Sequence, residues 1–183
     1  MTTPTLSEDH ILQQTRTWVE SFVIGYGLCP FAKHELVHDR IRFVVSRATS
    51  GLELASALED ELKRLARDET IGTTLLIHPG ALTDFQAYLA FLDMGNGLVE
   101  ELGLDGDIQI ASFHPTYQFA GTRPEDASNY TNRSPYPMLH LIREEDVSRA
   151  VETHPDVSGV PSRNIALMQE LGVDKLKALT SGG

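Results

Sequence analysis

Apolar residues recur along the chain at two spacings, and the elements that they predict alternate between helix and strand. Helical spacing, with a serine or threonine cap before it, predicts three long helices that begin after Ser7, Ser50 and Thr83. Short aliphatic runs predict four strands, at Arg40–Arg47, Thr73–Pro79, Asp107–Pro115 and Pro137–Glu144. Shorter helical patterns close the chain, around residues 145–153, 163–171 and 175–179.

The order of these elements predicts the fold class. Strands separated by helices favour crossover connections, so we expect an α/β layered fold with a mainly parallel sheet of four or slightly more strands and flanking helices. The strand at 137–144 has no crossover helix before it, so it should be antiparallel or an edge strand. Gly95 and Gly97 interrupt the third long helix and predict a break or kink there. The 183 residues fit a single domain, residues 1–183.

A long segment without a regular pattern, Phe113–Pro137, precedes the last predicted strand. Connections in compact domains usually take about 4–6 residues, and a much longer one is either functional or disordered. Its aromatic side chains favour order, because they can bury surface. They are Phe113, Tyr117, Phe119, Tyr130 and Tyr136. We therefore predict one long ordered loop that contributes to a functional site.

Composition restricts the classes of partner. The net charge of −11 and a pI near 5.0 give a surface that repels phosphate, which argues against nucleic-acid and anionic-membrane binding. No apolar run approaches the ~18 residues of a membrane span. Residues 1–10 lack the basic and apolar regions of a secretory signal, so we expect a cytoplasmic protein. A single cysteine excludes an internal disulfide.

Cys29 is the first candidate for chemistry. It follows the glycines that end the first helix and precedes Pro30, a favoured first helical residue, so it would cap the segment Pro30–His34. Free N–H groups and the helix dipole at such a position lower the pKa of a thiol and favour a nucleophilic thiolate. Lys33 would add positive potential. The alternative is a small buried hydrophobic residue, a common state of free cysteine.

Histidines stand at the ends of two predicted strands and inside a third. His78 and His114 each precede proline, which holds the residue before it in an extended conformation. Ligands gather at the carboxyl ends of strands in α/β sheets, and His114 also opens the long loop, so it is the candidate general base. His140 lies within the last strand. Alternatively, His-Pro simply ends each strand, with the ring hydrogen-bonded to a nearby carbonyl.

The long loop carries most of the candidate substrate-binding residues. In so acidic a chain, Arg123 and Arg133 predict an anion site, because guanidinium binds a carboxylate or phosphate through two parallel hydrogen bonds. Arg133 is the stronger candidate, because Glu125 and Asp126 stand next to Arg123 and could pair with it. The other residues assigned to substrate binding are Asn129, Asn132, Tyr117, Ser134 and, outside the loop, Lys33.

Three stretches together, "GLCPFAK", "FHPTYQF" and "NYTNRSPYPMLHLIRE", resemble the DUF1415 family of bacterial and plant-organelle proteins. The resemblance covers nearly the whole chain. The family was defined without an assigned activity, so the resemblance implies no reaction. It implies only that several residues act as one constellation: Cys29, His114, Asn129, Asn132, Arg133 and His140.

The leading functional hypothesis is an enzyme that acts on a small anionic metabolite bearing a carboxylate or phosphate. Cys29 would be its nucleophile, and His114 its general base or the partner that orients the base, as in thiol-dependent hydrolases and transferases, which need no cofactor for this step. The second hypothesis is a zinc or iron site formed by His78, His114 and His140 together with an Asp or Glu. The third is a non-catalytic module that binds a metabolite or peptide. The sequence does not indicate a homo-oligomer.

Overall fold

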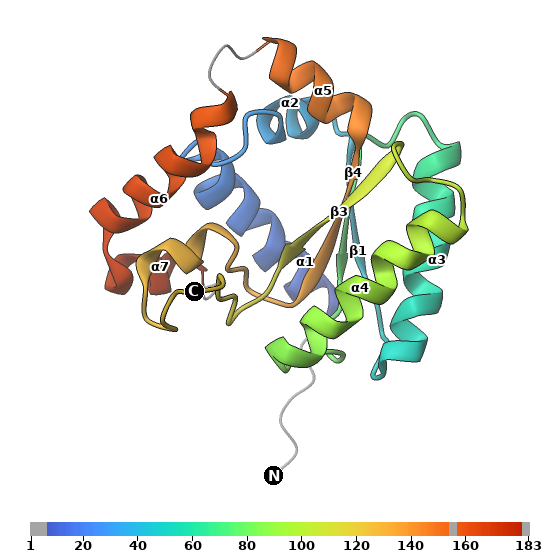
Figure 1. Cartoon of the computed structure of the whole chain (residues 1–183), viewed down its shortest axis with the longest axis horizontal. Coiled ribbons are helices and arrows are strands. Elements are labelled where there is room, and N and C mark those ends of the chain that lie inside the picture. The colour runs from blue at the N-terminus through green and yellow to red at the C-terminus, as the bar shows by residue number, and fades with distance from the viewer. Residues whose placement is uncertain (1–6, 154–156, 181–183) are drawn as a thin grey trace.

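A four-stranded sheet with helices on both faces forms the centre of the protein in the computed structural model, which describes residues 7–153 and 157–180 (Figure 1). The strands are β1 (Ile41–Val45), β2 (Thr73–Ile77), β3 (Ile108–Phe113) and β4 (Met138–Arg143). Each coincides with a predicted strand, and the α/β fold class is confirmed.

The order of the strands is β1-β2-β4-β3. β1 and β2 are parallel, and β4 is antiparallel to both β2 and β3. These pairings show that β1, β2 and β3 run in the same direction. A helix joins β1 to β2 and another joins β2 to β3, and such crossovers connect parallel strands. β4 enters between β2 and β3 in the opposite direction. The prediction of a mainly parallel sheet was wrong for this reason, and β4 is antiparallel but not an edge strand.

Helices cover both faces of the sheet. α3 (Gly51–Arg67) and α4 (Phe85–Glu101) pack on one face. Figure 1 shows the helices of the other face on the opposite side of the strands: α1 (Glu8–Trp18), α6 (Val160–Leu171) and α7 (Val173–Thr180). The remaining helical segments are the π-helical turn η1 (Val19–Ile24), α2 (Ala32–Val37), η2 (Ala127–Thr131), α5 (Glu144–Thr153) and η3 (Val157–Gly159). Within the described ranges, no helix is long and apolar enough to cross a membrane.

Local sequence signals set the start of the long helices. Ser50 accepts a hydrogen bond from the Glu53 N–H (3.3 Å), and the Glu53 carboxylate accepts one from the Thr49 N–H (2.7 Å). This pair of contacts satisfies N–H groups that have no partner inside the helix. At α4 the cap is Asp84, one residue after the expected Thr83, and its carboxylate accepts from the backbone N–H of the first turn.

α4 continues through Gly95 and Gly97, so the predicted break is absent from this helix. The reason is close packing. A Cβ atom at Gly95 would lie 3.3 Å from the Leu58 side chain of α3 and 3.4 Å from the Ile110 side chain of β3, so glycine lets α4 pack closely on both elements. Gly95 is buried, and the apolar contacts around it offset the helix propensity that glycine lacks.

Candidate functional site

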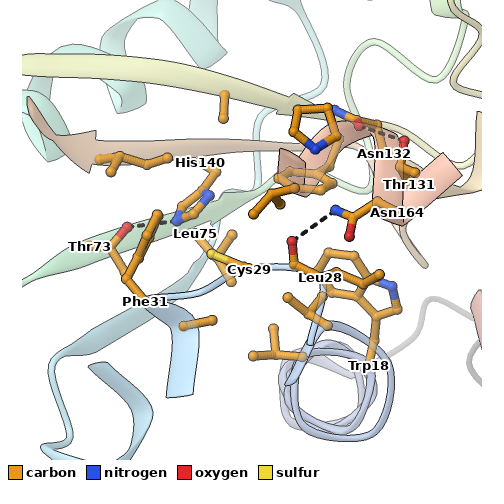
Figure 2. Close-up of a pocket in the computed structure, with 18 of the residues that line it drawn as sticks. Trp18, Leu28, Cys29, Phe31, Thr73, Leu75, Thr131, Asn132, His140 and Asn164 are labelled. Atoms are coloured by element: carbon orange, nitrogen blue, oxygen red, sulfur yellow. Dashed lines mark hydrogen bonds between the residues drawn. The ribbon is translucent and has the colours of Figure 1, made fainter. Parts of the chain in front are cut away.

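A cavity of about 500 Å³ lies on the α1 and α6 side of the sheet. Strand residues form one wall, among them Thr73, Leu75 and His140 (Figure 2). The other walls come from η1, the turn before α2, the long loop and the first part of α6. The cavity therefore joins segments that are far apart in the sequence.

Most of the cavity lining is apolar. The described lining residues include no Asp, Glu, Lys or Arg. Trp18, the single tryptophan of the chain, packs edge-to-face on Phe113 with ring centroids 5.4 Å apart, and both line the cavity. The polar lining residues are Cys29, Thr73, Thr122, Ser128, Thr131, Asn132, His140 and Asn164.

Alternation along the strands decides which histidine reaches the cavity. Successive side chains of a strand point to opposite faces of the sheet. On β4, His140 lines the cavity, whereas its two strand neighbours are buried in the core beneath α3 and α4. On β3, Phe113 lines the cavity, and His114, the next residue, packs against Phe85 and Tyr88 of α4 on the other face.

The protonation of His140 follows from its neighbours. The Thr73 hydroxyl oxygen lies 2.6 Å from the Leu141 carbonyl oxygen and 2.7 Å from Nε2 of His140. A carbonyl can only accept, so Thr73 donates its one proton to Leu141 and receives the Nε2–H of His140. Nδ1 of His140 is then a bare acceptor, with no hydrogen-bond partner among the described residues. Burial lowers the pKa of His140 to about 4, so the ring is neutral at pH 7.

Cys29 lies in the turn before α2 and lines the cavity, and in Figure 2 its sulfur points toward the part that His140 lines. The helix begins at Ala32 with Phe31 in the N-cap position, so the prediction that Pro30 begins it and Cys29 caps it was wrong. Burial raises the pKa of the Cys29 thiol, and hydrogen bonds from the N–H groups of Phe31 and Ala32 offset this only in part. This shift is opposite in direction to the one predicted for a thiol at a helix N-terminus.

Two asparagines line the cavity, and they differ in whether the amide oxygen already accepts a hydrogen bond. Asn164 of α6 donates its Nδ2–H to the Leu28 carbonyl (2.9 Å), and its Oδ1 has no hydrogen-bond partner among the described residues (Figure 2). Both ends of the Asn132 amide are occupied: Nδ2 donates to the Ser112 carbonyl (3.0 Å), and Oδ1 accepts from the Thr131 hydroxyl (3.1 Å). Asn164 therefore presents a free acceptor, and Asn132 holds the loop against β3.

His114 does not meet Cys29, because the two lie on opposite faces of the sheet. Both ring nitrogens of His114 are engaged: Nδ1 accepts from the Thr116 N–H (3.1 Å), and Nε2–H donates to the Leu82 carbonyl (3.1 Å). His78 is also on the α4 side, fully buried, and donates Nδ1–H to the Ala81 carbonyl (2.9 Å). The alternative interpretation, in which His-Pro ends a strand and the ring bonds a carbonyl, describes both residues.

The three histidines of the metal hypothesis do not converge. His140 faces the cavity, whereas His78 and His114 pack beneath α4. Within residues 7–153 and 157–180, no group of three or more His, Cys, Asp or Glu side chains is arranged to hold a metal ion. The zinc or iron hypothesis gains no support from this arrangement.

The loop arginines bind groups of the protein itself. Arg133 donates to the carbonyl oxygens of Tyr117 (3.1 Å) and Pro124 (2.6 Å). Arg123 pairs with Asp126 (3.2 Å), and the backbone N–H of Arg123 is the main cause that lowers the pKa of Asp126. Neither arginine lines the cavity. The internal pairing that the sequence suggested for Arg123 is present, and Arg133 too is occupied.

Asn129 is a structural centre of the long loop. It is fully buried, and its Oδ1 accepts from the Phe119 N–H (3.0 Å) and the Thr122 hydroxyl (2.8 Å). Its Nδ2 donates to the Arg123 carbonyl (2.7 Å). Phe119 and Thr122 line the cavity, so Asn129 positions part of the cavity wall without reaching the cavity itself.

The other three candidate substrate-binding residues lie outside the cavity lining. Ser134 is buried and donates to the Tyr136 carbonyl (2.7 Å). The Tyr117 hydroxyl lies 3.3 Å from the Ser112 hydroxyl. Lys33 is exposed on α2. The contacts of Ser134 and Tyr117 stabilise the loop, and the Lys33 side chain faces solvent.

A family model described as "Protein of unknown function (DUF1415)" matches residues 10–178. The chain belongs to this family. The DUF1415 match covers all four strands and the whole cavity lining, and it confirms the resemblance found in the three sequence stretches. No curated protein and no solved structure matches the chain.

The constellation implied by the DUF1415 resemblance separates into two groups. Cys29, Asn132 and His140 line the cavity. The other three residues, His114, Asn129 and Arg133, bond to the protein around it. Sequence reasoning missed Trp18, Thr73 and Asn164 as site residues. The sequence pattern indicated a special position only for Thr73, which begins a buried strand. Trp18 and Asn164 lie in segments with helical spacing, where nothing distinguished them from other helix residues.

Proposed function

We propose that the protein binds a small, mainly apolar molecule in the cavity between the sheet, η1, the long loop and α6. The observation that carries the proposal is the cavity itself, of about 500 Å³, mostly apolar and with a few polar groups. Ligand sites commonly have volumes of about 300–1,000 Å³ and this kind of lining. An anionic ligand has less support, because Arg123 and Arg133 bond within the loop and the described lining carries no cation.

The neutral fluorescent probe N-phenyl-1-naphthylamine should bind with saturation and quench the fluorescence of Trp18. Trp18 is the only tryptophan and lines the cavity, so a titration followed at tryptophan emission reports on this site. Ala111 lies in the strand wall. Ala111→Leu fills part of the cavity and should weaken binding by about tenfold or more.

Ala90→Leu is the matched control, because it makes the same change on the exposed surface of α4. Its titration should equal that of the native protein. A linear, non-saturating response, or equal affinity of native and Ala111→Leu proteins, would reject the proposal.

A thiol-dependent reaction is the second candidate, and one observation favours it: Cys29 and His140 line the same cavity. In an acyl transfer, Nδ1 of His140 accepts the thiol proton while the sulfur bonds to the carbonyl carbon of an ester or thioester. The imidazolium then gives that proton to the leaving oxygen or sulfur as its bond to carbon breaks, and the acyl group stays on Cys29. Thr73 holds the ring in the tautomer that this step needs. Such nucleophile–base contacts commonly tighten only when substrate binds.

p-Nitrophenyl hexanoate should transfer its acyl group to Cys29, releasing nitrophenolate and adding the mass of one hexanoyl group. Since Cys29 is the only cysteine, Cys29→Ser tests whether the added mass lies on the thiol. His140→Gln should slow acylation by about 100-fold, the usual contribution of a general base. His114→Gln is the control on the opposite face and should leave the rate unchanged. Equal rates in the two histidine variants would exclude His140 as the base.

A further inference from the structure

We infer that the cavity selects an uncharged, mainly apolar ligand that carries an N–H or O–H donor, such as an amide or an alcohol. This inference rests on the proposed binding function and names the class of ligand. It is carried by the juxtaposition of two free hydrogen-bond acceptors, Nδ1 of His140 and Oδ1 of Asn164, in a cavity whose described lining has no charged side chain.

A backbone carbonyl, that of Leu141, determines which ring nitrogen of His140 is free to accept a hydrogen bond. The Leu141 carbonyl takes the Thr73 proton, so the Thr73 oxygen must accept from Nε2–H, and the proton of the neutral ring cannot be on Nδ1. Thr73 is buried, and two oxygens 2.6 Å apart need a proton between them, which the Thr73 hydroxyl supplies. A ligand therefore meets a lone pair at His140.

The acceptor on Asn164 is set in the same way. The Leu28 carbonyl can only accept, so the amide nitrogen of Asn164 must face it and the amide oxygen is left for a ligand. Figure 2 shows Asn164 and His140 on different walls of the same cavity, Asn164 from α6 and His140 from β4. One polar group of a ligand, or two separate groups, can donate to them.

Most donors of the lining are already used within the protein. The hydroxyls of Thr73, Thr122 and Thr131 each donate to a protein oxygen, on Leu141, Asn129 and Asn132 respectively, and the Asn132 amide donates to Ser112. Nε1 of Trp18 has no partner but is itself buried from solvent. The Ser128 hydroxyl and the weakly donating Cys29 thiol remain. The free acceptors of His140 and Asn164 thus face a lining whose only remaining strong donor, among the described residues, is the Ser128 hydroxyl.

The uncharged lining disfavours both anionic and cationic ligands. A carboxylate or phosphate placed here would leave water, meet lone pairs and find no lysine or arginine among the described lining residues. An ammonium ion would lose its hydration without gaining a carboxylate partner. A neutral donor satisfies the acceptors without either cost.

Three ligands with one ring system test this inference by calorimetry: 1-naphthylacetamide, its N,N-dimethyl derivative and 1-naphthylacetate. The primary amide should bind at least about tenfold more tightly than the derivative without N–H groups and than the carboxylate.

Thr73→Val removes the hydroxyl that determines the His140 tautomer, so the ring can carry its proton on Nδ1 and donate to a ligand. The preference for the primary amide over its dimethyl derivative should then fall by at least about threefold. Thr74→Val is the matched control, because the buried Thr74 side chain is the next residue of β2 and its hydroxyl has no partner among the described residues. Its ligand order should equal that of the native protein.

A second variant avoids a buried position. Ile165 lines the cavity and is 39% exposed, so Ile165→Lys places a cation at the rim without entering the core. It should tighten binding of 1-naphthylacetate by at least about threefold, with little effect on the amide. Met94→Lys, on the exposed surface of α4, is the control for added charge.

The outcomes separate this inference from the proposed function. Equal or tighter binding of the carboxylate by the native protein overturns the ligand class, and so does equal binding of the dimethyl derivative. Saturable binding of N-phenyl-1-naphthylamine in the same preparation would then leave the proposed function standing. If neither that probe nor the amide binds, both proposals are overturned.

Discussion

Lowering the pH from 7 toward 4 should destabilise the fold strongly, chiefly through buried histidines. Burial lowers the pKa of His78 from 6.5 to about 4. The stabilising contribution of neutral His78 is fully present above pH 6.5 and is lost as the pH falls from 6.5 toward 4. In this range the unfolded chain binds a proton that the folded chain excludes. A shift of this size corresponds to about 3 kcal/mol for His78. His140 adds a similar effect in the same window, reduced because it borders the cavity.

Urea unfolding at a series of pH values measures this effect as a slope of the unfolding free energy against pH. His78→Asn keeps a side-chain N–H that can donate to Ala81 but removes the titrating ring, so its slope between pH 6.5 and 5 should be smaller. His10→Asn, on the exposed surface of α1, is the control and should keep the native slope.

The acidic residues act in a different pH window. Hydrogen bonds lower the carboxylate pKa of Asp68 and Asp126 below their ordinary value of 3.8, so these groups lose their stabilising effect only at more acidic pH. A change in stability between pH 6.5 and 5 is therefore assigned to histidine. Identical slopes for the native and His78→Asn proteins would contradict the buried, neutral state of His78.

Asn129→Ala should destabilise the long loop and weaken ligand binding together. The change removes an acceptor of two hydrogen bonds and the donor to the Arg123 carbonyl, and it leaves buried groups without partners. The expected loss is on the order of 3 kcal/mol in unfolding free energy. Because Phe119 and Thr122 line the cavity, binding of N-phenyl-1-naphthylamine should weaken as well.

Hydrogen exchange across residues 113–137 distinguishes a local effect from a global one. In Asn129→Ala, exchange should accelerate most in this loop. Asn129→Asp keeps the acceptor and loses the donor, so it should fall between the alanine variant and the native protein. Asn96→Ala, exposed on α4, is the control. Unchanged protection of the loop in Asn129→Ala would show that other contacts hold it.

Local physics made much of the fold predictable. Helix caps and apolar spacing depend on residues three or four positions apart, so the starts of α1 and α3 and the positions of all four strands followed from the sequence. The common direction of β1, β2 and β3 was also implicit in the helices that join them. The position of β4 was not, because strand pairing joins residues far apart in the chain.

The candidate site was only partly predictable for the same reason. The sequence by itself determined that Cys29 follows a helix, that His140 lies in a strand, and that the segment 113–137 carries polar and aromatic residues. Only the tertiary structure decided that β4 enters between β2 and β3 with His140 facing α6, and that His114 faces α4 instead. Whether a side chain binds a ligand or a protein carbonyl depends on which groups distant segments bring within about 3 Å of it, and sequence spacing does not encode those distances.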